Sequence, residues 1–185
     1  MMGRPALFLD RDGVVNVDHG YVSTPADFEF LDGIFDLCRT AKQLGYWVFI
    51  ITNQAGIGRG YYTEEDFQIL TEWMKDAFKA AGAEVDAVYY SPYHPEHGVG
   101  QYKRDSDCRK PKPGMLVQAT KDFEVDLAGS VLVGDKVTDI AAGIAAGVAR
   151  NLLFIPPLGK SYEQAPNGAT AVIKSLREAV AYLGN

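Results

Sequence analysis

Two carboxylates, Asp10 and Asp12, stand two residues apart directly after the apolar run Ala6–Leu9. If this run is a strand, Asp10 lies at the carboxyl edge of a sheet, where α/β folds build their sites. Gly13 then allows the chain to turn sharply. Carboxylate oxygens suit Mg²⁺, which completes its coordination shell with water and substrate phosphate. The pattern favours a nucleophile or metal ligand at Asp10 and a proton-handling group at Asp12, although a solvated turn explains the same spacing.

Polar groups also follow two later apolar runs. Thr52 and Asn53 close the first of them. Asp135 follows the second, and Asp139 lies one helical turn further on. If the strands are parallel neighbours, these groups reach the same sheet edge as Asp10, where they can hold phosphoryl oxygens and supply a further carboxylate to the metal. In isolation, each of these side chains could instead cap a helix or bond a nearby turn.

Three cations occupy four consecutive positions just before a predicted helix: Arg109, Lys110 and Lys112. Such a run is usually a solvated face. Here Pro111 and Pro113 restrict the backbone ahead of a helix N-terminus, a setting that attracts phosphate through its dipole and its backbone donors. Arg109 could grip planar oxygens bidentately, whereas either lysine would act as a point charge.

The elements that must position these residues alternate along the chain. Apolar residues at helical spacing predict helices over 34–44 and 67–81, the second capped at its N-terminus by Thr63. Strands alternating with helices indicate an α/β fold with a mostly parallel sheet and right-handed crossovers. Short runs rich in β-branched and aromatic residues predict five buried strands: Ala6–Leu9, Trp47–Ile51, Val85–Tyr90, Val131–Val133 and Leu152–Ile155.

Length and composition restrict the class of protein. The chain has 185 residues, 47% of them hydrophobic, which predicts a single domain over 1–185 with a proline-rich loop at about 91–114 over the site. A net charge of −6 argues against nucleic-acid binding. No apolar stretch suits a membrane span or a secretory signal, so we expect a cytoplasmic protein. Cys38 and Cys108 are too few for a disulfide framework, and Cys38 is expected to be a buried thiol.

The motifs taken in chain order resemble the haloacid dehalogenase (HAD) superfamily of phosphotransferases. The set is the D-x-D-G that begins at Asp10, the Thr52-Asn53 strand end, the lysine-rich turn and the G-D-K-x-x-D that ends at Asp139. The resemblance implies a three-layer Rossmann-like fold without a large cap domain and a Mg²⁺-dependent phosphoric monoester hydrolase. Within the superfamily, four longer segments are similar to the phosphatase family that acts on D-glycero-D-manno-heptose 1,7-bisphosphate: 16–21, 52–60, 70–74 and 108–115.

The resemblance also implies roles for individual residues. Asp10 would form an aspartyl-phosphate, and Asp12 would protonate the leaving hydroxyl and then activate water. Thr52 and Lys110 would steady the transferring group. Mg²⁺ would be held by Asp10, the backbone carbonyl of Asp12, and Asp135. The residues expected to line the substrate site are Asp18, His19, Gly20, Tyr21, Asn53, Gln54, Ala55, Arg109 and Lys136.

One departure from the family concerns the proline-rich loop. The family commonly holds this loop with a structural zinc, using a C-x-H pair followed by a C-x-C pair. Here Ser91 and Tyr93 stand at the first pair, and Ser106 and Cys108 at the second. Because a tetrahedral zinc site needs four suitable donors, we predict no structural zinc.

The expected substrate is a small sugar bisphosphate, and the expected reaction removes the C7 phosphate to leave heptose 1-phosphate for nucleotide-activated heptose and lipopolysaccharide synthesis. The α or β anomer of the substrate is left open. Histidinol-phosphate phosphatase is the alternative enzyme, because its family has closely related motifs. A catalytically silent sugar-phosphate binding protein is the alternative outside enzymes. We expect a monomer with no nucleic-acid or membrane partner.

Overall fold

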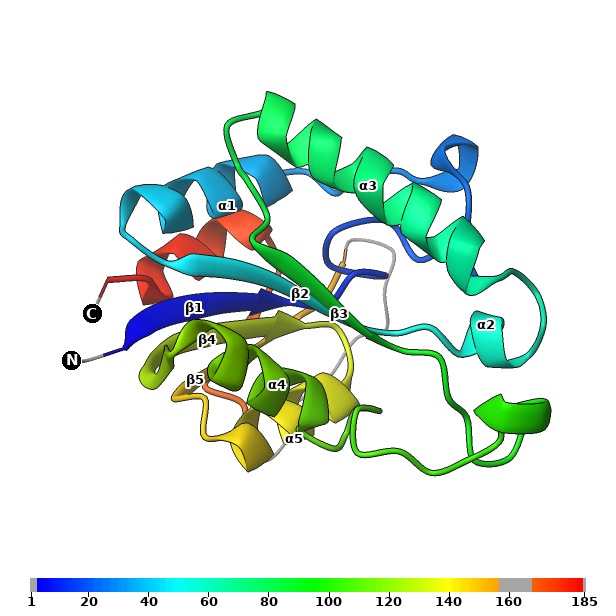
Figure 1. Cartoon of the computed structure of the whole chain (residues 1–185). Helices are drawn as coiled ribbons and strands as arrows, with labels where there is room; N and C mark the ends of the chain where they lie inside the picture. The colour runs from blue at the N-terminus through cyan, green and yellow to red at the C-terminus, as the bar shows by residue number, and fades with distance from the viewer. Residues whose placement is uncertain (1–2, 157–167, 185) are drawn as a thin grey trace.

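A six-stranded, all-parallel sheet forms the centre of the computed structural model, which describes residues 3–156 and 168–184 (Figure 1). The strand order is β3-β2-β1-β4-β5-β6, so the direction of winding reverses beside β1. Ligands of open α/β sheets bind at such a switch point, beyond the carboxyl ends of the strands. The strands are β1 (Arg4–Leu9), β2 (Trp47–Asn53), β3 (Ala87–Ser91), β4 (Val125–Gly134), β5 (Arg150–Phe154) and β6 (Ala171–Ile173).

Helices cover both faces of the sheet and give the three layers that the sequence predicts (Figure 1). Because successive strand side chains point to opposite faces, Leu7 and Leu9 pack toward one helical layer and Phe8 packs toward the other. The first layer holds α1 (Ile34–Gln43), α3 (Glu64–Ala80) and the 3₁₀ helix η3 (Leu176–Tyr182). The second layer holds α4 (Gly114–Phe123) and α5 (Val137–Ala146). The remaining short helices are η1 (Pro25–Asp27), α2 (Ala55–Gly58) and η2 (Gly100–Tyr102).

The predicted helix start at Thr63 is confirmed. The Thr63 hydroxyl accepts a hydrogen bond from Asp66 N at 3.1 Å, and the Asp66 carboxylate accepts one from Thr63 N at 2.8 Å. This reciprocal capping box satisfies two amide groups that the first turn of α3 leaves without helical partners. Cys38 is fully buried as a free thiol, as expected.

The largest differences from the predicted strands are at β4 and β6. β4 begins six residues before the predicted Val131, because its first half is polar and irregular against β1. There the Ser130 hydroxyl, and not a backbone carbonyl, accepts the hydrogen bond from Ala6 N at 2.9 Å. A search for apolar runs cannot detect such a segment. β6 has only three residues and was not predicted.

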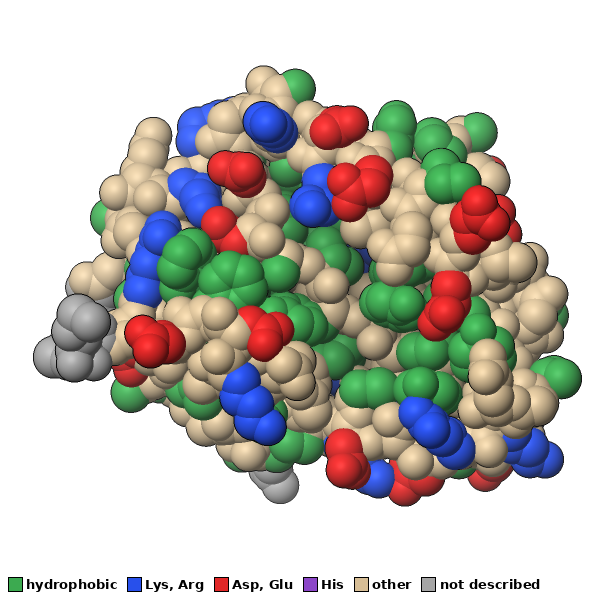
Figure 2. Space-filling view, in the orientation of Figure 1, with side chains coloured by type: hydrophobic (Ala, Val, Ile, Leu, Met, Phe, Trp, Pro, Cys, Tyr) green, Lys and Arg blue, Asp and Glu red, His purple; other side chains and the backbone are tan. Residues whose placement is uncertain are grey.

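The surface in view carries both signs of charge. Lysine and arginine side chains alternate with aspartate and glutamate on the face drawn in Figure 2, so this face presents no broad basic patch for a phosphate backbone. Within residues 3–156 and 168–184, no helix is both long enough and apolar enough to cross a bilayer.

Candidate active site

Three carboxylates meet at the switch point of the sheet. Asp10 follows β1, Asp135 follows β4, and Asp139 lies in the first turn of α5. Each offers an oxygen within 4.8 Å of the others. Asp135 Oδ1 is buried and has no hydrogen-bond partner among the described residues. Clustered carboxylates with an unsatisfied buried oxygen fit a hard divalent cation such as Mg²⁺, so the donor set suits the metal that the sequence predicts.

A buried lysine lies against this cluster. Lys110 Nζ is 2.8 Å from Asp10 Oδ1 and 2.6 Å from Asp139 Oδ1, and it donates to the Ile51 carbonyl at 2.9 Å. Burial and the neighbouring Asp139 raise the pKa of Asp10 well above its ordinary value, and Lys110 opposes that shift. Burial disfavours the charged form of Lys110, but Asp10 and Asp139 outweigh it and raise the lysine pKa. Lys110 is therefore a fixed cation beside the predicted nucleophile.

Asn53 fixes the backbone that carries this lysine. Its Nδ2 donates to the Lys110 carbonyl at 3.1 Å, and its Oδ1 accepts from Lys110 N at 3.0 Å. The sequence assigns Asn53 to substrate binding. In the structure the residue borders the cavity, but its amide is committed to the loop that places Lys110.

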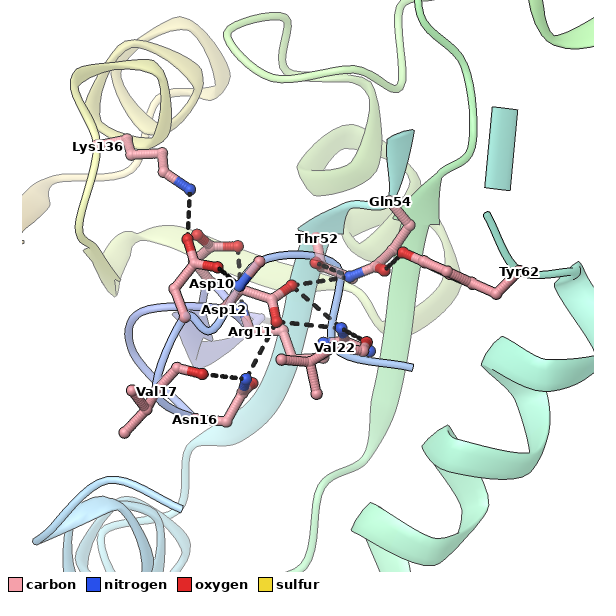
Figure 3. A network of polar contacts seen from close by, with 12 residues as sticks. Asp10, Arg11, Asp12, Asn16, Val17, Val22, Thr52, Gln54, Tyr62 and Lys136 are labelled. Carbon is pink, nitrogen blue, oxygen red and sulfur yellow. Dashed lines mark hydrogen bonds and ion pairs between the residues drawn. The ribbon is translucent and has the colours of Figure 1, made fainter. Parts of the chain in front are cut away.

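Asp12 is held by a separate set of donors (Figure 3). Its Oδ1 accepts from Asn16 Nδ2 at 3.0 Å, and its Oδ2 accepts from Gln54 Nε2 at 3.0 Å. Arg11 Nη2 is 3.1 Å from both carboxylate oxygens and also donates to the Val22 carbonyl at 2.7 Å. Gln54 is only 2% exposed. The predicted substrate-binding residue Gln54 thus directs its amide to Asp12.

Gln54 also contacts the end of β2. Its Nε2 donates to Thr52 Oγ1 at 2.8 Å, and Thr52 itself is buried. Accepting this bond leaves the hydroxyl proton of Thr52 free to be donated elsewhere. Thr52 is not among the residues that line the cavity described below, so its phosphoryl contact stays a prediction.

A cavity of about 370 Å³ opens above these groups. It brings together most of the predicted substrate residues: Asp18, Gly20, Tyr21, Asn53, Gln54, Ala55, Arg109 and Lys136. His19 is not among the lining residues; its exposed ring lies 3.2 Å from Glu29. Sequence reasoning did not identify Gly56, Tyr62 and Thr138, which also line the cavity. Their types carry no chemical signal of their own, and only their contacts single them out.

Two further cationic side chains, Arg109 and Lys136, line the cavity. Arg109 is half-buried, and its Nη1 donates to the Tyr93 carbonyl at 3.1 Å. Burial and the nearby Arg59 both lower the pKa of Arg109. Lys136 Nζ lies 3.5 Å from Asp18. The cavity lining thus combines the buried carboxylates with cationic side chains.

The loop between β3 and α4 is tied together at the positions expected for zinc ligands. Cys108 Sγ donates to Ser91 Oγ at 3.2 Å and lies 3.1 Å from Ser106 Oγ. These hydrogen bonds join the start of the loop to its end, next to Arg109. The expected lack of a structural zinc stays a prediction.

Gly13 is required for the placement of Asp135. It has φ +96°, and a Cβ at this position would overlap the Asp135 carboxylate. We expect Gly13→Ala to destabilise the protein by roughly 3 kcal/mol and to weaken Mg²⁺ binding, because backbone strain and displacement of the predicted metal ligand Asp135 act together. Thermal unfolding and Mg²⁺ titration measure the two effects.

The matched control is Gly45→Ala, at a position with φ +85° where a Cβ meets nothing within 4 Å. This variant introduces only the backbone strain, which should cost about 1–2 kcal/mol of folding stability. Its affinity for Mg²⁺ should equal that of the wild-type protein. Equal Mg²⁺ affinity in the two variants would contradict the displacement of Asp135.

Comparisons with known proteins agree with this geometry. Residues 107–179 match the family model described as HAD-hydrolase-like. The chain is 51% identical to D-glycero-alpha-D-manno-heptose-1,7-bisphosphate 7-phosphatase of Burkholderia mallei, over 98% of this chain and 95% of the relative. It is 49% identical to D-glycero-beta-D-manno-heptose-1,7-bisphosphate 7-phosphatase of Vibrio cholerae, over 98% and 97%.

A solved structure shows the same likeness. D,D-heptose 1,7-bisphosphate phosphatase of B. bronchiseptica, determined with magnesium and phosphate, superposes with a TM-score of 0.80. It is 29% identical, and the match covers 96% of each chain.

Proposed function

This chain belongs to the heptose-1,7-bisphosphate 7-phosphatase family of HAD-type hydrolases, and we propose that it removes the C7 phosphate of D-glycero-D-manno-heptose 1,7-bisphosphate. The products are heptose 1-phosphate, a precursor of nucleotide-activated heptose, and inorganic phosphate. The observation that carries the proposal is the buried Asp10–Lys110 pair in a cavity that Arg109 and Lys136 also line. A bisphosphate can place one phosphate at Asp10 and the other beside a second cationic side chain.

In the proposed reaction, an Asp10 carboxylate oxygen attacks phosphorus, and the bond from phosphorus to the C7 oxygen breaks. Asp12 gives a proton to that departing oxygen, so the sugar leaves as a neutral alcohol. Asp12 then takes a proton from water, which attacks the aspartyl-phosphate and releases phosphate, regenerating the Asp10 carboxylate. Lys110 and Thr52 hold the transferring oxygens in place during both steps.

The proposed metal is Mg²⁺, held by Asp10, Asp135 and the backbone carbonyl of Asp12. When bound, it supplies charge neutralisation at the phosphoryl oxygens. Support comes from the mutual approach of Asp10 and Asp135 and from the magnesium in the B. bronchiseptica structure.

Phosphate release in the presence of Mg²⁺ tests the proposal, with both anomers of heptose 1,7-bisphosphate and histidinol phosphate as substrates. We expect a strong preference for one heptose anomer. Preference for histidinol phosphate would retain the mechanism and overturn the substrate. No metal-dependent turnover of any phosphate ester would indicate a silent binding protein.

Arg109 is proposed to recognise the phosphate that is not hydrolysed. We expect Arg109→Ala to lower kcat/KM for the bisphosphate by about 10- to 100-fold, the size of effect that a lost charge-assisted bond produces, while turnover of p-nitrophenyl phosphate stays nearly unchanged. Steady-state kinetics on both esters measure the difference. Arg104→Ala is the matched control, because Arg104 belongs to the same loop but is exposed and stacks on Tyr93. Equal losses on the two esters would contradict a recognition role for Arg109.

A further inference from the structure

The geometry points to Tyr62 as a positioning residue that orients Asp12 through the Gln54 amide. Tyr62 lies between α2 and α3 and is 9% exposed. Its hydroxyl donates to Gln54 Oε1 at 2.5 Å, and the same amide donates through Nε2 to Asp12 Oδ2 (Figure 3). The inference rests on the proposed function, because it assumes that Asp12 handles protons in phosphate hydrolysis.

The hydroxyl determines which way the amide faces. A carboxamide has one accepting end and one donating end, and an ionised carboxylate only accepts. The Tyr62 donor therefore holds Oε1 on its own side and directs Nε2 toward Asp12 and Thr52. Burial raises the pKa of Tyr62 to about 12, so the hydroxyl keeps its proton at neutral pH.

Loss of the hydroxyl removes this constraint. Oε1 would then lie in a buried site without the donor that it now has, which is unfavourable. Rotation of the amide by 180° would place Oε1 against Asp12 Oδ2, where two acceptors repel each other. The rotated amide no longer donates to Asp12 Oδ2, so loss of the Tyr62 hydroxyl weakens the hold of Gln54 on Asp12.

The local sequence makes room for the Tyr62 ring. A Cβ at Gly56 would overlap the ring, so glycine at this position of α2 lets the tyrosine approach the helix backbone. The ring also packs with Ile57 and Phe67 in a small apolar cluster. The ring is thus held by packing, and the hydroxyl donates its hydrogen bond to Gln54.

Asp12 needs a defined orientation because it must reach both the leaving oxygen and the attacking water. Asn16 and Arg11 hold Oδ1, and Gln54 fixes Oδ2 with help from Arg11. A small misplacement of a proton-transfer group slows the chemical step strongly and leaves substrate binding unchanged. The effect of Tyr62 should therefore appear in kcat, not in KM.

The test is Tyr62→Phe, which keeps the ring and removes the hydroxyl. Single-turnover release of the leaving group is measured with heptose 1,7-bisphosphate and with p-nitrophenyl phosphate. We expect about a tenfold slower release from the sugar ester and less than about a twofold change for the nitrophenyl ester, because nitrophenolate leaves without a proton. KM for the sugar ester should stay within about twofold of the wild-type value.

Tyr46→Phe is the matched control. Tyr46 is also buried; its hydroxyl donates to Gly129 O at 3.2 Å and accepts from Gly184 N at 2.9 Å, and none of these residues lines the cavity. Tyr46→Phe should reduce folding stability about as much as Tyr62→Phe does. It should not slow leaving-group release from the sugar ester more than from the nitrophenyl ester. Equal slowing of both esters by Tyr62→Phe, no slowing, or an effect confined to KM would each overturn the inference.

A double-mutant comparison tests the route through Gln54. Adding Tyr62→Phe to Gln54→Leu should slow sugar-ester release no further, whereas additive losses would show that Tyr62 acts by another path. The result is separable from the proposed substrate. If the wild-type enzyme hydrolyses only other alkyl phosphates, the heptose proposal fails, and the same comparison on one of those esters still decides the role of Tyr62.

Discussion

Asp10→Asn is expected to reduce phosphatase turnover by at least about 10⁴-fold, because the amide cannot form an acyl phosphate with the substrate. The substitution nearly preserves side-chain volume, so the cavity keeps its shape. Steady-state phosphate release with Mg²⁺ measures the loss. Turnover within about tenfold of the wild-type rate would rule out covalent catalysis by Asp10.

The same variant should fold at least as stably as the wild-type protein when no metal is added. Burial, Asp139 and Asp135 all raise the pKa of Asp10, which means that its negative charge is disfavoured where it stands. Removal of that charge relieves repulsion among the carboxylates, although it also weakens the contact with Lys110. Thermal unfolding without metal provides the check, and it separates lost chemistry from lost structure.

Lys110→Met should cost about 3–5 kcal/mol of folding stability, because removal of one partner leaves buried carboxylates without their cation. The lysine side chain is 2% exposed and contacts both Asp10 and Asp139, so solvent cannot replace it. Turnover should also fall by about 10²–10³-fold, the size of effect expected for a group that stabilises developing charge. Denaturant unfolding without metal and phosphate release measure the two losses.

Two comparisons make this prediction specific. Lys112→Met is the matched control: its side chain is 41% exposed and pairs with Asp105, so it should change stability by less than about 1 kcal/mol and leave turnover intact. Adding Asp139→Asn to Lys110→Met should recover part of the lost stability, since it removes one uncompensated charge, but it should not recover turnover. Similar losses in the two lysine variants would show that the buried pair has no special role.

Local patterns in the sequence predict the alternating strands and helices and the groups that meet at the centre of the fold. Buried strands and amphipathic helices are recognisable from local periodicity, and parallel strands bring their carboxyl ends to one edge. The approach of Asp10 and Asp135 follows from that rule alone, and so does the position of Thr52. The capping box at Thr63 is similarly local, because all its partners lie within one helical turn.

The partners of individual side chains depend instead on how distant segments fold together. Lys110 was one of three cations in a turn, and its contact with Asp10 joins residues that are 100 positions apart. Gln54 lines the cavity, and only the structure shows that its amide is bonded to Asp12, 42 positions away. Tyr62 has no signal in the sequence, because its role depends on the position of its hydroxyl beside Gln54.

Residue type limits which bonds a side chain can make, but it does not fix the side chain's direction. That direction depends on how separate segments pack, and packing is a property of the whole chain. His19 illustrates the limit, since it lies beside cavity residues in sequence yet points to Glu29 outside the cavity. The chemical groups of this site could therefore be predicted from the residues that follow the strands. The hydrogen bonds that orient these groups could be identified only in the folded structure.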